Sequence, residues 1–125
     1  MLNITLVALG GAIGSVLRYL VGVATLRSFG PDFPWGTLAV NLVGGLLIGV
    51  IAGVFALRAE APQEARLFLI TGCLGGFTTF SAFSLDAVTL FERGQALTAA
   101  IYVATSVGFS IGGVVAGLAL MRAIL

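Results

Sequence analysis

Four long apolar stretches constrain the fold of this 125-residue chain more than any other feature. They cover residues 2–29, 37–57, 67–91 and 96–121, and each is about as long as the roughly 20 apolar residues that cross a hydrocarbon core. Only 9% of the residues are charged, whereas a soluble domain carries about 25%. The sequence therefore predicts one domain, residues 1–125, that is an all-α, multi-pass protein of the cell membrane with four transmembrane helices.

The inventory of reactive side chains argues against several classes of function. The chain has no histidine, and its net charge of +1 offers no basic surface for nucleic acid. Its single cysteine, Cys73, excludes a disulfide framework or a cysteine metal cluster. The serines have no neighbouring general base that could activate them as nucleophiles. We therefore expect neither an enzyme nor a nucleic-acid-binding protein.

The arginines are balanced across the predicted membrane. With four spans both termini lie on one side, together with Arg58, Arg66 and Arg122, whereas Arg27 and Arg93 lie opposite. Arg18, near the far end of the first span, makes the count three against three. Orientation follows an excess of Lys and Arg on the cytoplasmic side, and this chain has almost none. The balance favours insertion both ways round and an antiparallel, dual-topology homodimer; the alternative is one orientation fixed by other features.

The third span contains a segment, Gly72–Ser84, that is unusual at membrane depth. Three glycines within five residues disfavour a regular helix, so we expect this helix to be broken near Gly75–Thr79. Irregular backbone is tolerated there only where it is buried in protein or lines a polar cavity. Phe77, Phe80 and Phe83 recur every three residues, and the edges of aromatic rings carry partial positive charge that can face an anion. This combination predicts a permeation site.

Polar residues in the second and fourth spans could contribute to such a site. Asn41, one turn after Thr37, offers two amide donors to an anion, but interhelical hydrogen bonding is an equally good interpretation. Tyr102, Ser106 and Ser110 form one stripe of hydroxyls at four-residue spacing. A stripe of donors could pass an anion along, although serine often bonds back to its own helix.

Two charged residues in or near the spans leave more than one role open. Arg18 either extends its guanidinium to the interface or forms an electropositive vestibule. Asp86 either completes a polar cluster or pairs with an arginine.

Three motifs resemble those of the Fluc fluoride channels, also called CrcB. They are Gly-Gly-Phe-Thr-Thr-Phe-Ser-x-Phe-Ser at 75–84, Gly-Thr-Leu-x-Val-Asn at 36–41, and Gly-Gly-x-x-Gly-x-x-x-Arg at 10–18. The similarity extends over the whole chain. It implies a fluoride-selective channel that passively exports fluoride from the cytoplasm and lowers its toxic concentration. It also implies an antiparallel dimer in the lipid bilayer with two pores at its interface.

The resemblance also assigns roles to individual residues. The implied fluoride pore contains Asn41, Phe80, Phe83, Tyr102, Ser106 and Ser110, with Thr37 and Thr79 as weaker candidates. The backbone carbonyls of Gly75 and Thr78 are implied ligands of a structural sodium ion at the dimer centre. An alternative is a proton-coupled exporter of the small multidrug-resistance type, but that mechanism needs a glutamate in the first span, where Arg18 is the only charge. A second alternative is a non-transporting assembly subunit.

Overall fold

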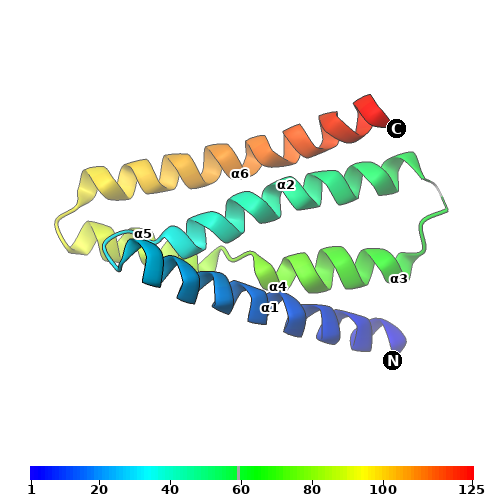
Figure 1. Ribbon diagram of the computed structural model, residues 1–125, viewed down its shortest axis with the longest axis horizontal. Coiled ribbons are helices and arrows are strands. Elements are labelled where there is room, and N and C mark those ends of the chain that lie inside the picture. The colour runs from blue at the N-terminus through cyan, green and yellow to red at the C-terminus, as the bar shows by residue number, and fades with distance from the viewer. Residues whose placement is uncertain (59) are drawn as a thin grey trace.

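The computed structural model describes residues 1–58 and 60–125, which form long helices packed side by side (Figure 1). The elements are α1 (Leu2–Phe29), α2 (Trp35–Leu57), α3 (Gln63–Arg66), the π-helical segment η1 (Leu67–Leu74), α4 (Gly75–Phe77), α5 (Ser81–Glu92) and α6 (Ala96–Ile124). Segments α3 to α5 follow one another along the third span, Gln63–Glu92. Within the described residues four helical stretches are long and apolar enough to cross a membrane, which confirms the predicted all-helical, four-span fold.

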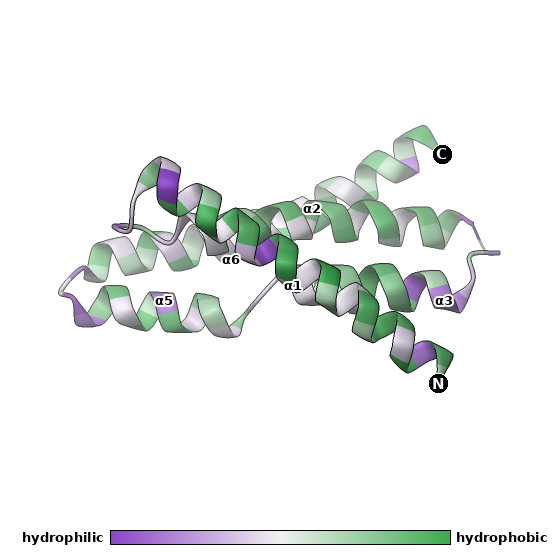
Figure 2. Cartoon of the chain, turned by 60° about the horizontal axis from the view of Figure 1, so that its bottom comes forward, coloured by the Kyte–Doolittle hydropathy of each residue, from purple (hydrophilic) through white to green (hydrophobic). Residues whose placement is uncertain are grey.

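Both chain termini and the α2–α3 connection lie at one end of the bundle, and the α1–α2 and α5–α6 connections lie at the other (Figure 1). Hydrophilic colour gathers in these connections, whereas the helices are mostly apolar or neutral along their length (Figure 2). The long helices therefore expose apolar surface between two polar ends, as a bilayer requires.

Glycine and proline determine where the helices end and begin at the end of the bundle that carries the α1–α2 and α5–α6 connections. Gly94, with φ of 77°, ends α5 in a Schellman motif: its amide donates to the Phe91 carbonyl, and the Gln95 amide donates to the Leu90 carbonyl, both at 3.0 Å. Pro34 begins α2 at Trp35, earlier than the predicted residue 37, because the Leu38 amide can bond to the proline carbonyl at 3.2 Å. At its C-terminus α6 continues past the predicted end to Ile124.

Glycines allow the helices to pack at backbone distance. A side chain at Gly45 or Gly49 would overlap the Ser110 or Val114 carbonyl of α6. On the other side of the bundle, a Cβ at Gly72 would lie 2.9 Å from the Cα of Gly10. Thus α2 packs along α6 and α1 packs along η1, in the close contacts that small residues permit between membrane helices.

The third span is interrupted between α4 and α5. Helix α4 ends at Phe77 and α5 begins at Ser81, so the residues 78–80 lie outside both helices (Figure 1). Thr78 is extended, with φ of −87° and ψ of 160°. This segment faces α2, and its geometry organises the candidate site.

Candidate functional site

Asn41 of α2 holds the non-helical segment of the third span in place. Its amide Nδ2 donates to the Thr79 carbonyl, and its Oδ1 accepts from the Thr79 amide, both at 2.9 Å. This pair of bonds satisfies the backbone of a residue that has left the helix, as buried backbone groups require. The interhelical role considered for Asn41 is therefore present, and one of its two N–H donors remains for another partner.

The same segment diverts two amides from their helical acceptors. In a continuous helix the Thr79 amide would bond to the Gly75 carbonyl, but it bonds to Asn41 instead. The Ala82 amide would bond to the Thr78 carbonyl, but it donates to Thr79 Oγ1 at 3.2 Å, just before the start of α5. The carbonyls of Gly75 and Thr78 therefore lose their helical donors, and both residues line an adjacent groove.

That groove, of about 460 Å³, lies between α2, the third span and α6. It brings together most of the residues that the sequence singled out. They are Asn41, Gly75, Thr78, Thr79, Phe80, Phe83, Ser106 and Ser110. Gly44 and Gly45 also line it, because a glycine there leaves space beside the Thr78 methyl group and the Ser110 carbonyl.

Two phenylalanines contribute to the groove in different ways. The rings of Phe80 and Phe83 are 5.6 Å apart between centroids and tilted by 50°. Phe80 is 77% exposed, whereas Phe83 is 8% exposed and packs in a core with Tyr102. Phe77 does not line the groove, so the expected stripe of three rings is wrong. The stripe assumed a helical spacing, which the extended Thr78 interrupts.

The serines of α6 place unpaired hydroxyls at the groove. Ser106 is 4% exposed, and within the part of the chain that the structure describes the hydroxyls of Ser106 and Ser110 have no hydrogen-bond partner. They therefore do not bond back to their own helix. A buried hydroxyl left without a partner costs about 1–3 kcal/mol, so these two groups are suited to a ligand that accepts hydrogen bonds.

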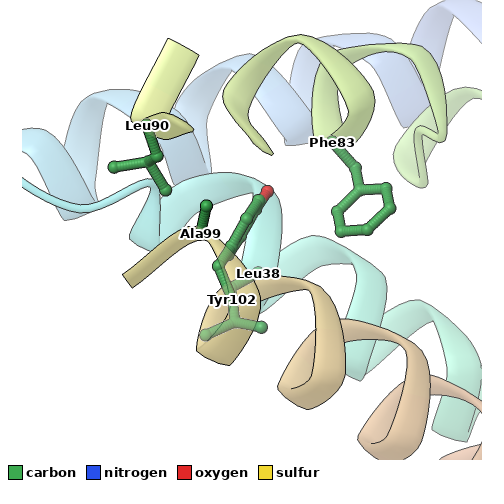
Figure 3. Close-up of a cluster of buried hydrophobic side chains, with 5 residues drawn as sticks. All are labelled: Leu38, Phe83, Leu90, Ala99 and Tyr102. Carbon is green, nitrogen blue, oxygen red and sulfur yellow. The ribbon is translucent and has the colours of Figure 1, made fainter. Parts of the chain in front are cut away.

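Tyr102 lies between this groove and a second pocket instead of lining the groove. Its side chain is fully buried and extends from α6 toward α5, with Leu90 and Phe83 on either side (Figure 3). Its hydroxyl donates to Asp86 Oδ2 at 3.0 Å. This bond gives Asp86 the polar-cluster role and leaves Tyr102 with no free proton in this arrangement.

Thr37 lies away from the groove, in the second pocket, which has a volume of about 350 Å³ and also contains Asp86. Thr37 therefore lies apart from the residues of the groove but beside Tyr102. Sequence reasoning also missed the apolar side of the groove, which is formed by Ile48, Ile70, Leu74, Val107, Ile111 and Val114. The only signal for two of these, Val107 and Val114, was their place on the helical face of Ser110, since apolar residues occur on every face of the spans.

The fold and the groove define a class: a four-span membrane protein with a largely apolar, phenylalanine-lined groove that carries serine hydroxyls and lies beside an interrupted third span. The model of the family described as "CrcB-like protein, Camphor Resistance (CrcB)" matches residues 5–118. The chain belongs to this family.

Curated relatives resemble the chain over nearly its whole length. A protein of Rhizobium etli (strain CIAT 652) is 64% identical over 124 residues, which is 99% of both chains. One of Agrobacterium fabrum is 63% identical over 122 residues, 98% of both, and one of Nitrobacter winogradskyi is 54% identical over 118 residues, 94% of both. All three relatives are named "Fluoride-specific ion channel FluC".

Proposed function

We propose that this chain is a fluoride-selective ion channel that passively exports fluoride from the cytoplasm and so lowers its toxic concentration. The observation that carries the proposal is the groove in which Phe80, Ser106 and Ser110 meet beside the segment held by Asn41. The names of the relatives favour this function over a multidrug-type exporter and over an enzyme.

The groove offers what a small, strongly hydrated anion needs when it loses water. The unpaired hydroxyls of Ser106 and Ser110 can donate hydrogen bonds to it. The rings of Phe80 and Phe83 can turn positive edges toward it, and the apolar wall excludes competing water. Selectivity in channels arises from pore width and from the donors that line the pore. Fluoride, the smallest halide, fits a narrow site of this kind best.

Passive conduction is sufficient for export. Fluoride enters cells as the neutral acid and ionises in a more alkaline cytoplasm, where the anion is trapped. A membrane potential drives one charge with about 2.3 kcal/mol per 100 mV. An anion channel in the cell membrane therefore lowers the internal fluoride concentration without any coupling reaction.

We further propose that the pore is completed by a second, oppositely oriented copy of the chain. The groove is open along one side, and Phe80 is 77% exposed there, so one subunit does not enclose an anion. The balanced arginines favour both orientations. In a Cys73→Ala background, we expect an impermeant thiol reagent to label Gln95→Cys in about half of the molecules from outside intact vesicles. Labelling of all or none of the molecules would contradict dual topology.

A sodium ion at the dimer centre fits the chemistry of the non-helical segment. The carbonyls of Gly75 and Thr78 are hard oxygen ligands, and their helical donors bond elsewhere. Two subunits would supply two such pairs, and a bound cation would compensate carbonyls that burial leaves unsatisfied. We expect fluoride release and dimer stability to fall when sodium is replaced by a large organic cation. Full activity in rigorously sodium-free solution would contradict the site.

The experiment that tests the proposed function compares two anions in one assay. With valinomycin present to let potassium leave, purified protein in liposomes loaded with potassium fluoride should release fluoride rapidly, and liposomes loaded with potassium chloride should retain chloride. Equal release of both anions, or of neither, would contradict a fluoride-selective channel.

A further inference from the structure

The α1–α2 connection and the C-terminal end of α5 line a second pocket. Both lie at the end of the bundle opposite to the chain termini (Figure 1). The pocket volume of about 350 Å³ has room for several water molecules. Polar side chains from three helices and two connections line it: Thr25, Asp32, Thr37, Asp86, Thr89 and Arg93. The lining of this pocket is therefore more polar than that of the groove.

A continuous series of aromatic contacts connects the groove to this pocket. Phe83, in the groove, contacts Tyr102 at a centroid distance of 5.3 Å. Tyr102 in turn contacts Phe33, which lines the pocket, at 5.4 Å and in an edge-to-face arrangement of 88°. Because Tyr102 is fully buried, it separates the two hollows, and Phe33 is the ring on its pocket side.

The α1–α2 connection is built to hold Phe33 against Tyr102. Gly30 has φ of 79°, a conformation that side chains disfavour, and ends α1. Pro34, with φ of −79° and ψ of 65°, forms an inverse γ-turn in which the Trp35 amide donates to the Phe33 carbonyl at 2.8 Å. The Trp35 ring packs on the Phe33 ring at 4.6 Å. Backbone and ring contacts thus fix the position of Phe33.

We propose that this pocket is a mouth of the permeation path, and that Phe33 lines the passage from Tyr102 into it. The inference rests on the proposed function, because it extends the path from the groove to solution. An anion that leaves the serines of the groove meets Tyr102 first, then the edge of the Phe33 ring, and then the hydroxyl-lined pocket.

The charges of the pocket are consistent with a place where the anion regains water. Arg93 attracts an anion, whereas Asp32 and Asp86 oppose it. Asp86 is engaged by the Tyr102 hydroxyl, Thr37 lies beside the same hydroxyl, and Thr25 bonds to the Val21 and Gly22 carbonyls. Among the threonines that line the pocket, Thr89 is therefore the one that these contacts leave free to meet an anion. This mixed lining does not bind the anion tightly, so it favours passage over retention.

Thiol modification tests the mouth directly. In a Cys73→Ala background that releases fluoride at the wild-type rate, Thr89→Cys is modified in detergent with the anionic reagent methanethiosulfonate ethylsulfonate and then reconstituted. We expect modification to slow fluoride release by more than about fivefold, because a bulky anion then occupies the passage. Glu92→Cys is the matched control: it lies on the same helix and is exposed but does not line the pocket, so its modification leaves release unchanged.

Mass spectrometry verifies that Thr89→Cys is completely modified. If fluoride release is then unchanged, the proposal that this pocket is a mouth of the permeation path is overturned. Equal inhibition at Glu92→Cys overturns it as well, because the effect is then not specific to the pocket. A wild-type protein that releases no fluoride instead refutes the proposed function, so the two failures are distinguishable.

Phe33→Leu tests the lining residue in the native chain. Leucine keeps apolar bulk but removes the ring edge, so we expect fluoride release to fall by about tenfold in a dimer with unchanged elution. Phe29→Leu is the control, because Phe29 contacts Trp35 but neither contacts Tyr102 nor lines the pocket. Wild-type release in Phe33→Leu, or an equal loss in Phe29→Leu, overturns the role of Phe33.

Discussion

Asn41→Asp abolishes fluoride release, with an expected loss of more than about a hundredfold, or about 2.8 kcal/mol in the barrier. Aspartate keeps an acceptor for the Thr79 amide but loses the Nδ2 donor that bonds to the Thr79 carbonyl. It places a carboxylate against that carbonyl and, when ionised, repels an anion in the groove. One substitution therefore damages both the geometry of the non-helical segment and the electrostatics of the path.

Asn3→Asp is the matched control. It makes the same chemical change outside the groove, because Asn3 is exposed at the start of α1. Fluoride release from liposomes is measured for both variants after gel filtration confirms that each is folded and monodisperse. Near-normal fluoride release in Asn41→Asp would show that conduction needs neither the hydrogen bond from Asn41 to the Thr79 carbonyl nor the second N–H donor of Asn41.

Phe80→Ile lowers fluoride release by about tenfold or more and leaves the fold almost unaffected. Isoleucine has no ring edge to stabilise the anion, and a loss of about 1.4 kcal/mol of that stabilisation corresponds to a factor of ten. Phe80 is 77% exposed in the subunit, so its replacement removes little core packing. Phe83→Ile is expected to reduce release similarly. Phe83 is 8% exposed, and its loss also lowers the free energy of unfolding, by about 1.5 kcal/mol or less for a swap of similar volume.

Phe91→Ile is the control for both variants, since Phe91 is 65% exposed on α5 and does not line the groove. Release and thermal unfolding are measured on the same samples. If both groove variants lose stability but release fluoride at the rate of Phe91→Ile, the rings serve packing alone.

The fold could be predicted from the sequence because length and apolarity suffice to define membrane-spanning helices. The ends were less predictable: α2 begins at Trp35 because the Pro34 carbonyl accepts a helical bond, which hydropathy does not register. The spacing of Gly45 and Gly49 predicts that another helix packs closely on this face of α2. It does not predict that this helix is α6.

The candidate site was predictable in its residue types and less so in its geometry. Asn41 and the serines of α6 were identified as polar groups in costly surroundings, and they do line one groove. The bonds between Asn41 and the Thr79 backbone join residues distant in sequence, and no local pattern indicates them. The contact of Phe33 with Tyr102 depends on the turn at Pro34, and helical spacing cannot predict it.

The central claim, passive conduction of fluoride, is tested most directly by the driving force for release. Liposomes that contain the wild-type protein and potassium fluoride are placed in fluoride-free solution at equal pH, and external fluoride is followed with an electrode. A channel predicts slow release that accelerates sharply when valinomycin lets potassium leave, because net anion flow needs a compensating charge. Release that is insensitive to valinomycin and appears only under an imposed proton gradient would contradict a channel and indicate coupled transport.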